Sequence, residues 1–237
     1  MFIDVRSHRT GNRLLDRLPE DESKRLTSQG QHVELPQGQT VYRQHGPISH
    51  VYFPTSGCCC HVVPLAEGRQ IEATTIGKEG MVGIHRALGL EFSPFTVVSV
   101  VRCEGLRIPV RCFVEMMRAG GLLDSLIKRY AAYCLSFASQ TLACNTVHTT
   151  EQRVCRRLLM AHDCVGADEF PLTQELLGQM LGVRRQSITL AARALQAAEF
   201  IEYRRGTIKV LNRRGLESAS CECYRLAKTA YDSIVTN

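Results

Sequence analysis

The chain has 237 residues, which is long enough for one large domain or two modest domains with buried cores. Hydrophobic residues make up 44% and charged residues 22%, values close to the globular average that exclude collagen-like and natively disordered chains. Lys and Arg number 29 against 23 Asp and Glu, which gives a net charge of +6. The position of this excess is more informative than its size.

The chain contains 11 Cys residues. Their odd number, and the adjacent Cys58, Cys59 and Cys60, argue against a framework of paired disulfides and favour a reducing compartment. No apolar run has the length of a signal-peptide core or a membrane span. We therefore expect a cytoplasmic protein.

The N-terminal half is expected to form a β domain. After a short helical segment at 14–28, residues 33–110 are rich in β-forming residues and are interrupted by glycines at intervals suited to short strands and turns. This pattern is typical of an all-β jelly roll. Together with the helical remainder, it predicts an α+β chain with domains at 1–120 and 149–237 joined by a helix at 121–148.

A long helix is predicted over 112–147, because apolar side chains recur there at alternating spacings of three and four. Such a seam packs either on its own barrel or on the same helix of a second subunit, and we expect the homodimer. The predicted dimer seam consists of Leu123, Ile127, Tyr130, Cys134, Phe137, Thr141 and Cys144.

The last third is predicted to hold a winged helix-turn-helix. Thr173 can cap a helix that runs to Leu181, and Gly182 separates it from a second helix at 185–198. The second helix would bury Ile188, Ala191, Ala192 and Leu195 on one face. Residues 200–203 and 207–211 read as the two strands of a wing around a glycine turn.

The charge excess lies on this motif. From Arg184 to Arg214 we count eight basic and two acidic residues, so this window carries the whole net charge. A basic surface of this kind attracts the phosphates of duplex DNA, although a merely solvated basic face is the alternative. The residues suited to reading base edges are Arg185, Gln186 and Thr189. Those suited to phosphates are Thr173, Arg184, Ser187, Arg204, Arg205 and Lys209.

These residues resemble the Crp/Fnr family of bacterial transcription regulators. The similarity is strongest over Leu172 to Thr189 and Arg204 to Leu211, which match the family's helix-turn-helix and wing. It is looser over Leu35 to Tyr42, Val51 to Gly57 and Ile76 to Gly83, which resemble the cyclic-nucleotide-binding-type jelly roll. The resemblance implies a non-enzymatic homodimer whose partners are double-stranded promoter DNA and RNA polymerase.

The chain departs from the family pattern in the recognition helix. That helix usually opens Ser-Arg-Glu-Thr and carries a second arginine one turn later. Here Arg184, Arg185, Gln186 and Ser187 take the four positions, and Leu190 replaces the arginine. The best-known operator of the family is therefore not expected to be the target.

A second departure concerns the effector. Family members that bind a cyclic nucleotide use a glutamate for the ribose and an arginine for the phosphate. Glu79 fits the first role, but the arginine position falls on Ser93 or Pro94. We expect an effector pocket that includes Glu79 and Ser93, no cyclic AMP binding, no cofactor, and a small effector of other chemistry if there is one.

Metal chemistry is expected to be absent. An iron–sulfur sensor needs four separated thiolates, Cys58 to Cys60 alternate between the faces of a strand, and Cys221 and Cys223 lack a matching pair. A cupin-like metalloenzyme remains the rival, since His45, His50 and His61 fall in the barrel segment, although they lack the His-x-His spacing. A dimeric scaffold with a solvated basic face is the third possibility.

Overall fold

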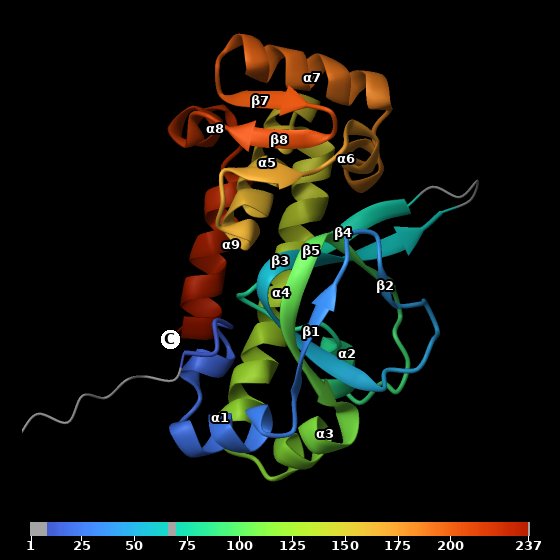
Figure 1. Cartoon of the computed structure of the whole chain (residues 1–237), viewed down its shortest axis with the longest axis vertical. Coiled ribbons are helices and arrows are strands. Elements are labelled where there is room, and N and C mark those ends of the chain that lie inside the picture. Colours follow the sequence, from blue (N-terminus) through green and yellow to red (C-terminus); the bar gives the residue numbers. More distant parts are fainter. Residues whose placement is uncertain (1–8, 66–69, 237) are drawn as a thin grey trace, which may run out of the picture.

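The computed structural model describes residues 9–65 and 70–236. Its N-terminal half is a five-stranded antiparallel sheet with helices at one end (Figure 1). The strands are β1 (Gln31–Leu35), β2 (Thr40–Tyr42), β3 (His50–Pro64), β4 (Gln70–Ile76) and β5 (Thr96–Pro109). The order is β1-β5-β3-β4, and β2 also pairs with β5. The predicted α+β class, with a β domain over this segment, is confirmed.

Two long strands, β3 and β5, carry most of the sheet and bend it through irregular register near Gly57 and Cys58. Gly57 has φ +67°, and a Cβ there would lie 1.9 Å from the carbonyl oxygen of Arg102. Only glycine fits this close approach. The next three cysteines are buried, with Cys58 and Cys60 in one apolar cluster and Cys59 in another, as the alternation of a strand requires.

Short helices surround the open end of the sheet. They are a 3₁₀ turn (Leu15–Arg17), α1 (Glu20–Thr27), α2 (Ile84–Ala87) and α3 (Val110–Arg118). The single helix predicted over 112–147 is wrong in one respect, because it is divided into α3 and α4 (Leu122–Val147). The break falls at Gly120 and Gly121, whose φ values of +77° and +92° end a right-handed helix.

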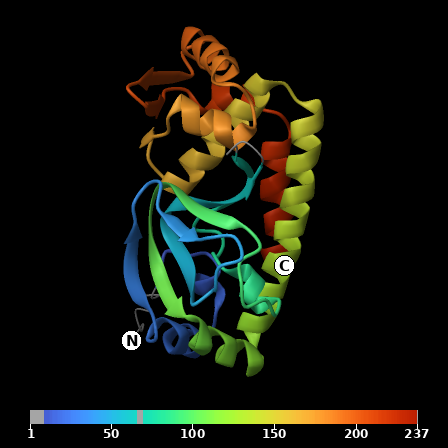
Figure 2. The ribbon, with the colours of Figure 1, turned by 90° about the vertical axis from the view of Figure 1, so that its right-hand side faces the viewer.

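Helix α4 runs along one side of the molecule and packs its apolar stripe on the chain's own core (Figure 2). Leu123, Ile127, Tyr130 and Phe137 are at most 5% exposed, and Cys144 is buried against Cys221. The predicted seam therefore corresponds to the intramolecular alternative rather than to a dimer contact. Cys134 and Thr141, the other two seam residues, are half-buried.

The C-terminal half consists of helices around a three-stranded sheet. Its helices are α5 (Thr150–Val165), α6 (Gln174–Leu181), α7 (Arg185–Ala197) and α8 (Arg213–Ala219). The sheet order is β6 (Glu169–Pro171), β8 (Thr207–Val210) and β7 (Ile201–Arg204). The wing hairpin is confirmed, and β6 adds a third strand to it, because Phe170 pairs with Ile208 and buries its ring.

The last helix, α9 (Cys223–Tyr231), leaves the winged motif and packs along α4 (Figure 1). Its C-terminal end reaches the β domain, where the Tyr231 hydroxyl donates to the carbonyl oxygen of Glu79 at 2.8 Å. A turn of π-helix at Asp232–Thr236 follows. Residues 223–236 therefore connect the two halves of the molecule instead of extending the C-terminal one.

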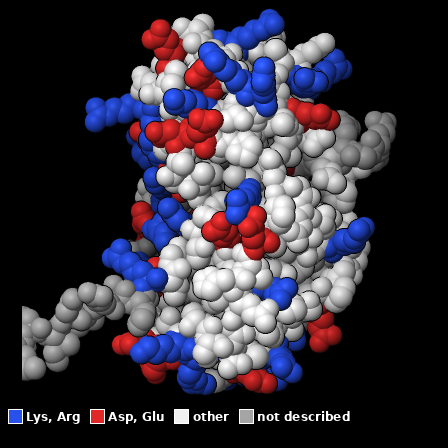
Figure 3. All heavy atoms as spheres, viewed as in Figure 1, with Lys and Arg blue, Asp and Glu red and all other residues white. Residues whose placement is uncertain are grey.

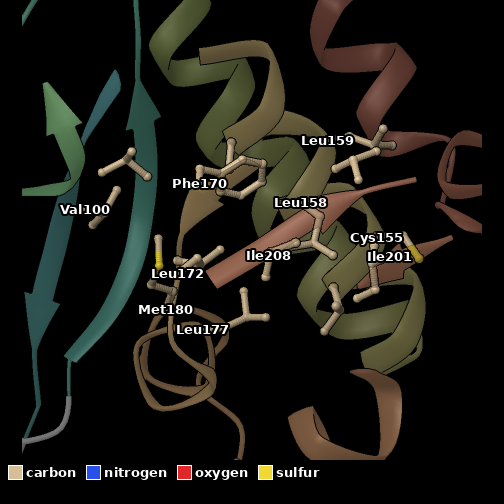
Figure 4. Close-up of a cluster of buried hydrophobic side chains, with 14 of the residues drawn as sticks. Val100, Cys155, Leu158, Leu159, Phe170, Leu172, Leu177, Met180, Ile201 and Ile208 are labelled. Carbon is tan, nitrogen blue, oxygen red and sulfur yellow. The ribbon is translucent and has the colours of Figure 1, made fainter. Parts of the chain in front are cut away.

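One apolar cluster crosses the boundary between the halves. It joins Val100 of β5 to Phe170, Leu172 and Met180 of the C-terminal half (Figure 4). Beside it, Arg157 of α5 forms a 2.9 Å ion pair with Glu72 of β4, and the two side chains are 4% and 9% exposed. Arg157 also donates to the Thr75 hydroxyl and to the sulfur of Cys60.

Arg157→Met leaves the buried Glu72 carboxylate without its ion-pair partner. The substitution should therefore lower the free energy of unfolding by about 3–5 kcal/mol. A second substitution, Glu72→Met, should recover much of that loss, since it removes the unpaired carboxylate. Urea denaturation of the two single variants and the double variant measures the coupling. Strictly additive losses would contradict a direct ion pair between the halves.

Candidate nucleic-acid interface

The candidate interface is built on α6 and α7. Thr173 caps α6, with its hydroxyl accepting from the Leu176 amide at 3.1 Å. Gly182 ends α6 in the left-handed region at φ +64°, which lets the chain turn sharply into α7. The predicted helix-turn-helix and both helix boundaries are thus confirmed to within one residue.

Helix α7 buries one face and leaves the other open. The buried residues are the four predicted from the spacing: Ile188, Ala191, Ala192 and Leu195. Arg185, Gln186 and Arg193 are exposed, and Leu190 among them is 66% exposed. The helix lies across one end of the molecule (Figure 1), so its outer face is open along its length.

Some of the residues predicted to contact DNA already use their side chains in hydrogen bonds within the chain. The Thr189 hydroxyl donates to Gln174 Oε1 at 2.7 Å, which fixes α7 to α6 and occupies the only proton that Thr189 could offer to a base. Ser187 is half-buried. The Thr173 hydroxyl is already an acceptor in its cap. Arg185 and Gln186, by contrast, are both exposed at the start of α7.

The wing places basic side chains beside α7. Arg205 and Gly206 have φ values of +48° and +84°, the signs that a type I′ hairpin turn requires at both central residues. Arg204, Arg205 and Lys209 are exposed, and the Arg204 Nε lies 2.6 Å from Glu202 Oε1. The amide of Leu172 donates to the carbonyl oxygen of Gly206 at 2.8 Å, so the tip is fixed to the start of α6.

Basic side chains gather at this end of the molecule, with a few acidic ones among them (Figure 3). One arginine of the basic segment 184–214 is paired with acidic side chains from other parts of the chain, so it is not available to bind DNA phosphates. Arg213 lies 2.7 Å from Asp163 and 3.0 Å from Glu217, and it also donates to the Tyr224 hydroxyl. Its charge is used to join α5, α8 and α9. The count along the sequence could not detect this, because Asp163 lies 50 residues earlier.

A separate cavity of about 380 Å³ lies where the β domain, α4, α5 and α9 meet. Glu79 is one of its lining residues, together with Arg13, Tyr133, Asp163 and Tyr231. Enclosure raises the pKa of the Glu79 carboxyl, although the Gly77 amide donates to it at 2.8 Å. Glu79 therefore lines a cavity, and its role in an effector pocket stays a prediction.

Ser93 does not line this cavity. Its hydroxyl donates to the carbonyl oxygen of Phe95 at 2.6 Å and its amide donates to Gly46, in the loop that precedes β5. The two residues that the sequence assigns to one pocket are thus not brought into this cavity together. Nothing in the sequence indicated that α9 contributes to this cavity, where Tyr224 and Tyr231 form one wall.

The three barrel histidines do not form a common site. The His61 ring stacks on Phe95 and its Nδ1 lies 2.9 Å from the Thr74 hydroxyl, while burial lowers its pKa to about 3. His45 instead faces Phe92, and His50 is hydrogen-bonded to Ser49. This arrangement provides no support for the cupin-like metalloenzyme.

Comparison with protein families gives two matches. Residues 32–119 match the cyclic nucleotide-binding domain, and residues 152–219 match the Crp-like helix-turn-helix domain. No curated protein matches the sequence of this chain. Helix α9 lies beyond both matched segments. Among the described residues, no helix combines the length and apolar character needed to cross a membrane.

Solved structures share the fold. A proposed transcriptional regulator of the Crp/Fnr family from Eubacterium rectale aligns with a TM-score of 0.67 at 18% identity, covering 89% of this chain and 99% of that one. FixK2 from Bradyrhizobium japonicum also gives 0.67, at 15% identity, with 81% and 98% covered. A proposed cAMP-binding regulatory protein from Silicibacter pomeroyi gives 0.62 at 23% identity, with 88% and 94% covered.

Proposed function

Because this chain belongs to the Crp/Fnr family of DNA-binding transcription regulators, we propose that it binds promoter DNA as a homodimer and reads its sequence through α7. The family is non-enzymatic. The observation that carries the proposal is the exposed pair Arg185 and Gln186 at the start of α7, with basic side chains on the adjoining wing. By family resemblance, RNA polymerase is the second macromolecular partner.

The exposed face of α7 offers a defined chemistry for base edges. Arginine forms a bidentate pair with guanine O6 and N7, and glutamine forms one with adenine N6 and N7. Leu190 is exposed one turn further along, where it suits the methyl group of thymine. Arg204, Arg205 and Lys209 would hold phosphates from the wing, because contacts from a hairpin tip position a protein without reading bases.

Arg185→Ala should weaken specific binding by about 1–3 kcal/mol and relax preference at one base pair in each half-site. Arg204→Ala should weaken binding to all sequences alike and reduce the slope of log affinity against log salt by about one. Fluorescence anisotropy with a selected site and a scrambled site, at several salt concentrations, separates the two effects.

The matched control is Arg25→Ala, which removes an exposed arginine from α1, in the other half of the molecule. It should leave both binding curves unchanged. Equal losses on the selected and scrambled sites in the Arg185 variant would contradict the proposed reading role.

The proposed dimer uses the outward face of α4. The inward stripe is occupied by the chain's own core, but a second stripe with spacings of three and four remains exposed. Its members are Ser125, Lys128, Ala132, Leu135, Ser139, Leu142 and Thr146. Leu135 and Leu142 are 73% and 70% exposed and lie one heptad apart, as in a two-stranded coiled coil.

Leu142→Asp should therefore convert dimers into folded monomers, because it places a charge in the helix pair but disturbs no intrachain packing. Phe137→Asp should instead lower the melting temperature sharply, since this ring is 5% exposed inside the chain. Sedimentation velocity and thermal unfolding distinguish these results. Leu88→Asp, at another exposed leucine, is the control, and an undiminished dimer in the Leu142 variant would rule out this face.

The β domain is proposed to have lost cyclic AMP binding. Glu79 lines a cavity whose other walls come from α4, α5 and α9, and Ser93, at the expected phosphate position, is neutral. A cyclic phosphate needs a cation to offset its desolvation. Because the Ser93 position offers no cation, we expect any effector to be uncharged or cationic rather than a cyclic nucleotide.

Millimolar cyclic AMP should therefore change neither the melting temperature nor the DNA affinity, because a ligand stabilises a protein only by binding its folded state. Differential scanning fluorimetry and anisotropy measure both quantities. A melting temperature that rises and saturates at micromolar cyclic AMP would contradict the proposal.

A further inference from the structure

Four potential metal ligands from distant parts of the chain meet at the end of α4. Cys144 lies in the last turn of α4 and His148 directly follows it, while Cys221 and Cys223 flank the start of α9. We call these four residues the Cys3His cluster. Their ligand atoms all lie within 4.8 Å of one another, and all three cysteines are buried. The winged motif and the Glu79 cavity do not use them.

We propose that the Cys3His cluster binds one tetrahedral metal ion, for which zinc is the best chemical match. Three thiolates and one imidazole form one of the ligand sets of structural zinc sites. Soft sulfur ligands select zinc over magnesium, calcium or manganese. This site is independent of the DNA-binding role proposed above.

The separations between ligand atoms fit a single ion. The sulfurs of Cys144 and Cys221 are 3.5 Å apart, and the sulfur of Cys223 lies 3.6 Å from Nδ1 of His148. Zinc–sulfur bonds of about 2.3 Å and zinc–nitrogen bonds of about 2.0–2.1 Å give tetrahedral edges of about 3.5–3.8 Å. These two pairs already have the separation of tetrahedral edges, and the other pairs, all within 4.8 Å, would have to shorten by at most about 1 Å to enclose an ion.

Two neighbouring side chains hold ligands of the Cys3His cluster in place, as outer-shell residues do around a bound zinc ion. Nε2 of His148 lies 3.2 Å from the carboxylate of Glu222, which leaves Nδ1 facing the thiols. Carboxylate–histidine pairs of this kind are the usual second shell of zinc sites. Gln140 Nε2 donates to the sulfur of Cys223 at 3.0 Å.

Charge is also compensated. Three thiolates around a divalent cation leave one negative charge, and the guanidinium of Arg156 lies beside the cluster, where it donates to the Thr141 hydroxyl at 3.0 Å, one turn before Cys144 on α4. Arg153, one turn earlier on α5, lines the same pocket as Cys144 and Arg156. The basic groups therefore lie on the α5 side of the cluster.

The ordinary explanation is that the thiols are small apolar core residues. The environment does not support it, because the three cysteines form a buried cluster of their own, separate from the aliphatic cores. An amide donor and an imidazole point at them instead of apolar side chains. An iron–sulfur cluster fits poorly, because four ligand atoms this close leave no room for several irons and sulfides.

The position of the site gives it a structural role. His148 stands between α4 and Thr149, the N-cap of α5, and Cys221 stands between α8 and α9. A bound ion would therefore cross-link the junction of the two halves to the segment that returns along α4. Loss of the ion should loosen α9 and the attachment of the C-terminal half.

The full-length protein, purified without chelators under reducing conditions, should contain about one zinc per chain by plasma mass spectrometry. Titration of the metal-free protein with Co²⁺ should give the intense visible bands of tetrahedral thiolate coordination. Removal of zinc with a chelator should lower the melting temperature, and added zinc should restore it.

The variants locate the site. Cys221→Ser should abolish stoichiometric zinc, and Glu222→Gln, which changes an exposed side chain, should weaken zinc binding about 10- to 100-fold while the fold is retained. Cys112→Ser, at a half-buried cysteine of α3, should keep full zinc content and is the matched control.

Three results would overturn the proposal. One is wild-type protein that contains no metal and gives no Co²⁺ bands at micromolar concentrations. The second is iron with acid-labile sulfide held by the same cysteines. The third is a Cys144–Cys221 disulfide in protein kept under reducing conditions, because it would remove two of the four ligands.

Discussion

The contact between the two halves of the molecule depends on how one buried guanidinium is paired. Arg157 of α5 reaches into the edge of the β domain, where Glu72, Thr75 and Cys60 accept its hydrogen bonds. A buried charge tolerates very few partners and geometries, so this contact sets the position of α5 on β4. The rest of the winged motif packs on α5 through a shared apolar cluster, and the orientation of α7 follows from it.

Helix α4 carries two stripes of side chains with the same spacing, one buried and one exposed. This explains why the burial of its apolar side chains was predictable from the sequence and their packing partner was not. The spacing predicts that Phe137 and its neighbours are buried, but it cannot tell which surface buries them. Leu135 and Leu142 lie on the other stripe, which looks less apolar in sequence because Lys128 precedes them and Ser139 lies between them. The long helix and its apolar stripe were predictable, whereas the surface that this stripe packs against was not.

The winged motif was predictable because it is built from local signals. A capping threonine, Gly182 and the apolar spacing of α7 act within a few residues of one another. Contacts between distant segments were not predictable. The Arg213–Asp163 pair and the pairing of β6 with β8 both join segments about 40 to 50 residues apart, and no local pattern reports them. The same limit explains the Cys3His cluster, since Cys221 and Cys223 gain their partners only when α9 folds back on α4.

The proposed function requires that a dimer of this chain reads a specific DNA sequence through α7. Selection of bound duplexes from a random pool is the decisive experiment, because it needs no knowledge of the target or the effector. We expect enrichment of an inverted repeat whose half-sites lie about one helical turn apart, with a guanine contact and an adenine contact in each half. A pool that shows no enrichment after repeated rounds, or that yields only single half-sites, would contradict it.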